Sequence, residues 1–209
     1  MVKYILTYFE VRGYAEAARQ VFHLAGVEFE DRRVTHDQWN AEIKEGTTLG
    51  KLPILQVDGF EIPQSQAITR YLARKFGFAG KTPEEQAWVD AIADQFKDFA
   101  GPFREYIVAE RLGKPTEEVA RIRAEVSVPA VESFVALLTN ILSKSKSGFL
   151  VGDNVTFADL ILADILVTLQ KNGFINNESK YEKVLEHQKR VHNLPGLKNY
   201  IETRPDTQF

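Results

Sequence analysis

The stretch ILQVDGFEIPQSQAITRYLARKF, residues 54–76, decides the fold class. It contains two short apolar runs, Ile54–Val57 and Phe60–Ile62, separated by an Asp-Gly dipeptide that is typical of a tight hairpin. From Ser65 to Phe76 the apolar residues recur at helical spacing, and Gly77 is a stop signal. The stretch therefore predicts two antiparallel strands followed by a helix.

The residues before this stretch add a β-α-β unit. Lys3–Phe9 is rich in aromatic and β-branched residues, which predicts a strand. Ala15–Ala25 has apolar residues at helical spacing, and Val27–Val34 predicts a second strand. The order β-α-β, a variable segment and β-β-α predicts an α/β unit with a small mixed sheet.

The pattern becomes helical after a short linker, Phe78–Pro83. One long helix carries a stripe that we expect in the core: Trp88, Ile92, Phe96, Phe99, Phe103 and Ile107. Further helices are expected at residues 116–147, 156–169, 181–191 and 196–203. The second part of the chain is therefore expected to be all-helical.

Composition excludes several classes of protein. The chain has 209 residues, a net charge of −3 and no cysteine, so no disulfide, thiolate metal site or cysteine nucleophile exists. The weak negative charge argues against a nucleic-acid partner. We find no signal peptide and no uninterrupted run of about 20 apolar residues. We therefore expect a cytoplasmic protein without a membrane partner. The four histidines lack metal-ligand spacing, so we expect no metal site.

Tyr8 lies at the carboxyl end of the first expected strand, where α/β sheets place their ligands. A hydroxyl there could donate a hydrogen bond to a thiol sulfur. Such a bond favours the thiolate, which is the nucleophilic form, and lowers the thiol pKa. The alternative is an ordinary aromatic side chain in a strand.

Two backbone features follow along the chain. A cis bond at Leu52-Pro53 would turn the Leu52 backbone outward as an edge that can pair with a peptide-like ligand. The alternative is a loop proline with a trans bond. Gln64-Ser65 precedes a helix, Ser65 is a good N-cap, and the helix N-terminus could also hold a carboxylate. The alternative is capping alone.

Three further groups of polar residues stand out. Trp39 and Lys44 could bind a carboxylate, but each could equally be an ordinary surface residue. Asp90, Asp94 and Asp98 form a stripe that is usually a solvated helix face. Thr156–Asp159 predicts a capping box, which is a folding signal.

Taken together, these clusters resemble one family. The segments YILTYFEVRG (residues 4–13) and GKLPIL (residues 50–55), the Gln64-Ser65 pair and Thr156–Asp159 are similar in order and spacing to sigma-class glutathione transferases, which nematodes and other animals carry. The similarity runs over nearly the whole chain. It implies the cytosolic glutathione transferase fold, with a thioredoxin-like domain (βαβαββα) at residues 1–78 and an all-α domain at residues 82–209.

The resemblance also implies residue roles. Tyr8 would activate the thiol of glutathione, and Asp98 would reach across a two-fold homodimer to the γ-glutamyl amine of the neighbouring subunit. The Leu52 backbone, before cis Pro53, would pair with the cysteinyl unit. The other residues expected to bind glutathione are Trp39 and Lys44 at its glycyl end, Gly50 and Lys51 beside Leu52, and Gln64 and Ser65 at its γ-glutamyl carboxylate.

Two departures from the family pattern matter. Many sigma-class members have an arginine where this chain has Tyr14, and that cation helps to stabilise the thiolate. Activation of the thiol is therefore expected either to be weaker here or to be supplied by Arg12. The prostaglandin D synthase branch uses an acidic trio for a divalent metal, and here Lys97 replaces one of the acids.

The implied activity is conjugation of glutathione, as co-substrate, to small electrophiles in detoxification, with no metal or prosthetic cofactor. Residues expected to line the apolar acceptor site are Phe9, Tyr14, Phe103, Tyr106 and Phe209. The alternatives are a non-catalytic carrier of haem-like or lipid-like ligands, a glutathione-dependent prostaglandin isomerase and a lens-crystallin-like structural relative.

Overall fold

The computed structural model describes residues 2–209, which form two compact units. One unit runs to Ala79 and includes Arg190–Phe209, and the other is Gly80–Lys189. The last segment of the chain therefore packs with the first, a grouping that sequence order alone does not indicate. The domain limits 1–78 and 82–209 stay a prediction.

The first unit contains a four-stranded mixed sheet in the order β2-β1-β3-β4. The strands are β1 Tyr4–Phe9, β2 Glu30–Val34, β3 Ile54–Val57 and β4 Phe60–Pro63. β1 runs parallel to β2 and antiparallel to β3, and β3 pairs antiparallel with β4. The expected hairpin is confirmed: Asp58 and Gly59 both have positive φ, at 49° and 89°, as such a turn requires.

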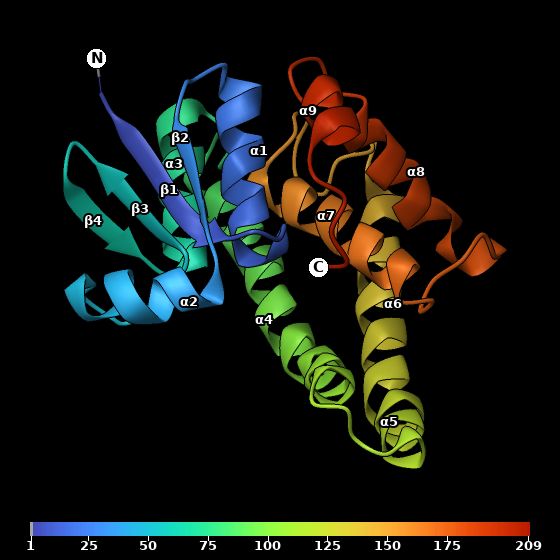
Figure 1. Ribbon diagram of the computed structural model, residues 1–209. Coiled ribbons are helices and arrows are strands. Elements are labelled where there is room, and N and C mark those ends of the chain that lie inside the picture. The colour runs from blue at the N-terminus through green and yellow to red at the C-terminus, as the bar shows by residue number, and fades with distance from the viewer. Residues whose placement is uncertain (1) are drawn as a thin grey trace. The chain divides into compact units, whose positions relative to one another are not determined.

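The sheet is accompanied by helices α1 Glu16–Ala25, α2 His36–Gln38, α3 Ser65–Phe76 and α9 Lys198–Thr203. The 3-10 turn Gly13–Ala15 precedes α1, while a π turn, Trp39–Ile43, and a 3-10 turn, Lys44–Gly46, follow α2. α1 packs against α3, and Figure 1 shows α9 beside α1. In agreement, the rings of His23 and Tyr200 stack with centroids 4.0 Å apart.

The start of β2 differs from the expectation. The sequence predicts a strand from Val27, but β2 begins only at Glu30. The N–H of Val27 donates instead to the carbonyl of Phe22, and Gly26 adopts the left-handed conformation that ends α1. The helix C-terminal motif therefore uses the backbone group that a strand would need.

The second unit consists of helices. They are α4 Pro83–Arg111, α5 Thr116–Ile122, α6 Val128–Lys144, α7 Phe157–Lys171 and most of α8 Glu182–His192, with a 3-10 turn at Ser179–Tyr181. The helix expected at 116–147 is interrupted by a π turn, Arg123–Ser127. Pro129 has no N–H to donate to the carbonyl four residues earlier, which favours such a local change in hydrogen bonding.

The segment Thr116–Lys144 is long and apolar enough, by length and composition, to cross a membrane. Its mean hydropathy in the best window is 1.5, although the sequence shows no uninterrupted apolar run of that length. Its buried residues, among them Phe134, Val135 and Leu138, pack inside the second unit. A core helix of this kind passes the same test, so the segment is weak evidence for a membrane span.

The buried face of α4 includes Ile92 and Phe99 of the expected stripe but not Trp88. Val89, Ile92, Phe99 and Tyr106 are buried, whereas Trp88 is 53% exposed, so its assignment to the core was wrong. Successive residues on a helix are rotated by about 100°, so the core is met by Val89 and its neighbour Trp88 lies to the side of the buried row. Phe99 supports the core through a stacked contact with Phe134, at 4.6 Å between centroids.

The capping box at the start of α7 is confirmed. Oδ2 of Asp159 accepts hydrogen bonds from the N–H and the hydroxyl of Thr156, at 2.7 and 2.8 Å. Its Oδ1 accepts the N–H of Leu150 at 2.8 Å and lies 2.8 Å from Nε2 of His187. No role was expected for His187, but its ring links α8 to this buried carboxylate.

Candidate functional site

Tyr8 is buried at the carboxyl end of β1, with 7% of its surface exposed. Its Oη accepts the backbone N–H of Tyr14 at 3.3 Å. Gly13 makes this approach possible, because a Cβ there would lie 2.8 Å from Oη and its φ is 42°. Burial raises the pKa of Tyr8, while the Tyr14 N–H and the charge of Arg19 lower it by smaller amounts. The hydroxyl therefore keeps its proton at neutral pH and can donate it in a hydrogen bond.

A buried ionic cluster lies close to Tyr8. Arg19, which is fully buried on α1, donates to Glu16 at 3.1 Å and to Asp31 at 2.9 Å. Glu16 also accepts from Tyr200 Oη at 2.8 Å and from Arg204 at 2.6 Å. Burial opposes ionisation of Glu16, but the charges of Arg204 and Arg19 outweigh it and lower the pKa of Glu16. The cluster thus joins α1, β2 and the end of the chain.

Arg12, the suggested alternative source of a cation, is bound to the last residues of the chain. Its N–H donates to the Phe209 carbonyl at 2.9 Å, and its Nη2 donates to the carbonyls of Thr207 and Gln208 at 3.4 and 3.3 Å. Only 2% of Arg12 is exposed. The backbone N–H and the side chain of Arg12 together therefore fasten residues 207–209 to the turn that follows Tyr8.

The residues around the third strand form a second part of the site. Leu52-Pro53 is cis, as expected. Trp39 is buried in a small apolar cluster with Val34 and Ile54, against which Leu52 packs. Lys44 and Lys51 are exposed, and Gly50 has a positive φ of 57°. The structure thus brings Trp39 and Leu52 together and leaves both lysine ammonium groups at the surface.

The entrance to α3 has an unusual backbone. Gln64 has φ 75° and ψ 115°, which is rare for a residue with a side chain. It occupies the N-cap position, and Ser65 is the first helical residue, so the expectation that Ser65 caps the helix was wrong by one position. Such conformations concentrate where ligands bind, and the first N–H groups of α3 are the kind that bind carboxylates.

Three of the predicted site residues belong to α4 in the helical unit. Asp98 is exposed and accepts from Gln95 Nε2 at 3.3 Å. Phe103 and Tyr106 both pack edge-on against Phe174, with centroids 5.3 and 5.1 Å away. Lys97, which replaces an acid of the metal-binding trio, also lies on α4, and its ammonium forms an ion pair with Asp94 at 3.0 Å. Among residues 2–209, no group of three or more His, Cys, Asp or Glu side chains could hold a metal ion.

Comparisons with known proteins identify the family. A model of the glutathione S-transferase N-terminal domain matches residues 5–74, and one of the C-terminal domain matches residues 97–204. Glutathione S-transferase 4 of Caenorhabditis elegans is 46% identical, with 99% of each chain covered. The chain belongs to the glutathione S-transferase family.

Solved structures agree with this assignment. A Nu-class transferase from Haemonchus contortus is 46% identical, covers all of both chains and superposes with a TM-score of 0.90. A transferase from the hookworm Necator americanus, described as monomeric, is 45% identical, with 99% of this chain and 100% of that one covered, at a TM-score of 0.90. The expected glutathione transferase fold is confirmed. The protein is a transferase that conjugates glutathione, its co-substrate, to electrophiles.

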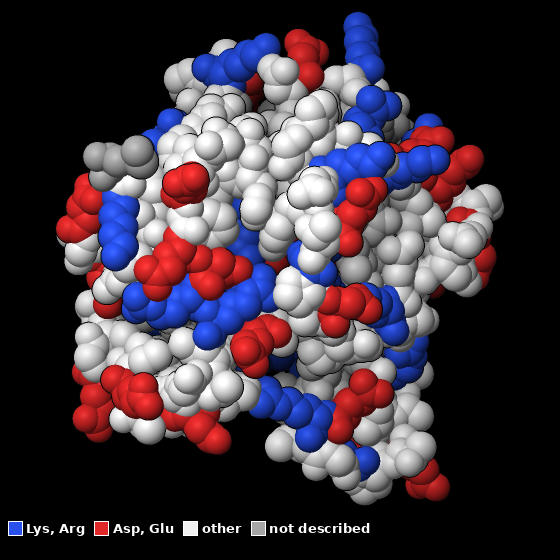
Figure 2. Space-filling model, turned by 45° about the horizontal axis from the view of Figure 1, so that its top comes forward, with Lys and Arg blue, Asp and Glu red and all other residues white. Residues whose placement is uncertain are grey.

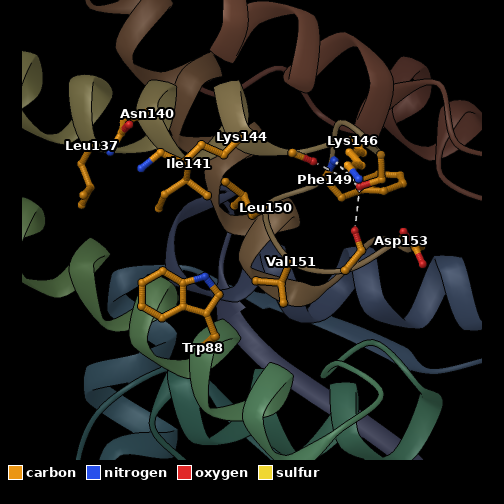
Figure 3. Close-up of a pocket in the computed structure, with 13 residues that line it drawn as sticks. Trp88, Leu137, Asn140, Ile141, Lys144, Lys146, Phe149, Leu150, Val151 and Asp153 are labelled. Atoms are coloured by element: carbon orange, nitrogen blue, oxygen red, sulfur yellow. Dashed lines mark hydrogen bonds between the residues drawn. The ribbon is translucent and has the colours of Figure 1, made fainter.

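One groove in this transferase escaped the sequence prediction. It has a volume of about 520 Å³ and lies between the start of α4, the end of α6 and the loop that follows α6. Figure 3 shows the exposed Trp88 pointing toward Ile141 and Leu150. None of the residues expected to bind glutathione or the acceptor lines it. The sequence prediction had assigned Trp88 to the core stripe of α4, so it did not point to this groove.

The surface charges of the transferase are mixed. Figure 2 shows acidic and basic side chains interspersed over the face in view. Ion pairs on β2, Arg32–Glu30 at 2.8 Å and Arg33–Asp31 at 2.8 Å, likewise combine both signs of charge. A nucleic-acid partner would call for a broad basic area, which this face lacks.

Proposed function

We propose that Tyr8 is the residue that activates the thiol of glutathione. The observation that carries this proposal is the hydrogen bond from the Tyr14 N–H to Tyr8 Oη at 3.3 Å. That bond occupies a lone pair of the oxygen and fixes its position, so the hydroxyl proton is available for the sulfur. Burial keeps the pKa of Tyr8 raised, so the donor stays protonated when the substrate thiol ionises.

The chemistry that follows is nucleophilic attack. The thiol proton passes to solvent, and the Tyr8 hydroxyl donates to the resulting thiolate, which stabilises its charge. The sulfur lone pair then forms a bond to an electrophilic carbon, and the leaving group departs with its bonding electrons. Holding both reactants in place supplies a further part of the rate.

The remaining glutathione contacts are proposed from the family pattern. They are Trp39, Lys44, Gly50, Lys51, Leu52, Pro53, Gln64 and Ser65. Support comes from the unusual backbone of Gln64 at the start of α3 and from the packing of Trp39 with Leu52. The two lysines could supply cations for the glycyl carboxylate, since both are exposed.

The residues that would line the acceptor site are also proposed from the family pattern, and their positions support it. Phe9 and Tyr14 flank Tyr8 in the α/β unit, and Tyr14 is 46% exposed. The ring of Phe9 lies 5.6 Å from that of Tyr8. In the helical unit Phe103 is partly buried and Tyr106 is buried, and the bond that Arg12 makes to Phe209 holds the last proposed acceptor residue in place.

We further propose a sigma-like cytoplasmic enzyme of detoxification that works as a homodimer sharing Asp98. The exposure of Asp98 on α4 is consistent with a contact to another subunit. The Lys97–Asp94 ion pair at 3.0 Å disfavours the metal-assisted prostaglandin isomerase alternative, because it places a cation among the acids.

Replacing Tyr8 by phenylalanine tests the central proposal. Loss of one hydrogen bond to a charged sulfur should cost about 1.5–3 kcal/mol, roughly a 10- to 100-fold fall in kcat/KM. Tyr4→Phe is the matched control, since Tyr4 lies on the same strand and is also buried. Both variants should fold and bind glutathione. Turnover of Tyr8→Phe equal to that of Tyr4→Phe at neutral pH would refute the assignment.

A further inference from the structure

Arg19 is the most completely enclosed cation near Tyr8. None of its side chain is exposed. Its Nη1 donates to the carbonyls of Val11 and Arg12, at 2.9 and 3.2 Å, as well as to Glu16, and its Nε donates to Asp31. Because an arginine fork has fixed geometry, four such bonds hold the guanidinium in one place.

The two carbonyls that Arg19 holds belong to the turn between β1 and the 3-10 turn Gly13–Ala15. The same turn continues into Tyr14, whose N–H reaches Tyr8 Oη. Arg19 therefore fixes the backbone from which that N–H is directed. If the turn shifted, the hydrogen bond from the Tyr14 N–H to Tyr8 Oη would weaken, because hydrogen bonds weaken steeply as their angle departs from linear.

Arg19 also acts on Tyr8 through its charge. Its guanidinium carbon lies 5.9 Å from the centroid of the Tyr8 ring. Its Nη2 is buried and has no hydrogen-bond partner in the part of the chain that the structure describes. A buried positive charge at this distance favours negative charge that develops beyond the Tyr8 hydroxyl.

Other charged or titratable groups surround Arg19. They are Glu16 and His23 on α1, Asp31 and Arg33 on β2, Arg12 and Tyr14 in the turn, and Tyr200 and Arg204 near the end of the chain. Of these, Arg204 binds the same carboxylate of Glu16 as Arg19 does, but it belongs to the last segment of the chain and not to α1. Arg204 is therefore a suitable comparison for Arg19.

We propose that Arg19 is a positioning residue for glutathione activation, which holds the turn that directs the Tyr14 N–H at Tyr8 and places a positive charge over the Tyr8 ring. Arg19 thus supplies the positive charge that helps to stabilise the thiolate. Position 14 is a tyrosine in this chain, and Arg12 is bound to residues 207–209. The proposal rests on the proposed role of Tyr8.

The test compares Arg19→Gln, Arg19→Lys and the control Arg204→Gln in the full chain. The ultraviolet absorption of the thiolate of bound glutathione, followed against pH, gives the midpoint of thiol ionisation. Arg19→Gln should raise this midpoint by about one pH unit, which leaves about tenfold less thiolate below it. Arg204→Gln should lower thermal stability and leave the midpoint unchanged.

Two results for the glutamine variants would overturn the proposal: an unchanged midpoint in Arg19→Gln, or equal shifts in Arg19→Gln and Arg204→Gln, which indicate a purely structural cluster. If Arg19→Gln does not fold, Arg19→Lys decides. A lysine keeps the charge but lacks the fork, so kcat should fall by about threefold with the KM for glutathione unchanged. An unchanged kcat would overturn the proposal.

Measuring Tyr8→Phe alongside distinguishes failure of the proposed role of Tyr8 from failure of the proposed role of Arg19. A wild-type midpoint in Tyr8→Phe would refute the proposed role of Tyr8 and the inference that rests on it. A raised midpoint in Tyr8→Phe together with a wild-type midpoint in Arg19→Gln would refute the role of Arg19 alone.

Discussion

Two carboxylates, Glu16 and Asp159, are both buried away from water, and they are stabilised by different kinds of partner. Both are almost completely removed from solvent, at 1% and 0% exposure. Asp159 is surrounded by backbone N–H groups, a threonine hydroxyl and a histidine ring. Glu16 is held by two guanidinium groups and a tyrosine hydroxyl.

The difference shows which buried charge is connected to chemistry. The contacts of Asp159 end within the helical unit, where they fix the start of α7. The contacts of Glu16 continue through Arg19 to the turn beside Tyr8. We therefore expect changes at Asp159 to affect stability alone, and changes at Glu16 to affect stability and thiol activation together.

The largest effect on stability is expected for Glu16→Gln. The change removes the negative charge that Arg19 and Arg204 share in a buried place and leaves Arg19 with Asp31 as its carboxylate partner. Breaking a buried ion pair costs about 3–5 kcal/mol. Because the pKa of Glu16 is lowered in the folded state, its contribution is present above the unfolded pKa and is lost as pH falls through the folded value.

Denaturant unfolding from neutral pH down to about pH 3 checks this prediction. The difference between wild type and Glu16→Gln should shrink below the ordinary carboxyl value of 4.5. A difference that does not change with pH would show that ionised Glu16 is not the source of the stability.

A smaller effect is expected for Asp159→Asn. The amide oxygen can still accept a hydrogen bond, but the amide N–H₂ then faces the N–H groups of Leu150 or Thr156. An unsatisfied buried donor costs about 1–3 kcal/mol. Turnover per folded molecule should equal that of wild type. A fall in kcat under conditions where the variant is fully folded would break the distinction between the two carboxylates.

The smallest effect on stability is expected for Asp98→Asn, because this carboxylate is exposed. Unfolding should change by less than about 0.5 kcal/mol. Glutathione affinity should fall by about 1–3 kcal/mol if the partner subunit's site uses this charge. Light scattering followed by calorimetric titration tests both parts: a monomeric wild type, or unchanged affinity in the variant, would contradict the shared site.

Local sequence signals predicted much of the fold. β3 and α3 lie where the 54–76 pattern places them, and the capping box of α7 is encoded within four residues. Errors arose where a neighbouring element used a group that the local pattern had assigned elsewhere. The N–H of Val27 completes the end of α1, and at the start of α4 the core is met by Val89 and not by its neighbour Trp88.

The polar network around the site could not be predicted from the sequence. Glu16 binds Tyr200 and Arg204, which are 184 and 188 residues away. No periodicity or motif connects positions so far apart. Tyr8 could be proposed because a strand end and a neighbouring glycine are local features, whereas the position of Arg19 beside it depends on tertiary packing.

The ionisation of glutathione bound to the enzyme tests most directly whether the Tyr8 hydroxyl activates the thiol. The measurement is a pH titration of its thiolate absorption in wild type and in Tyr8→Phe, with Tyr4→Phe as the control. We expect a midpoint well below the free-thiol value of about 8.5 in wild type and in the control. In Tyr8→Phe the midpoint should rise by about one to two units. A midpoint in Tyr8→Phe equal to that of wild type would contradict the claim that the Tyr8 hydroxyl activates the thiol.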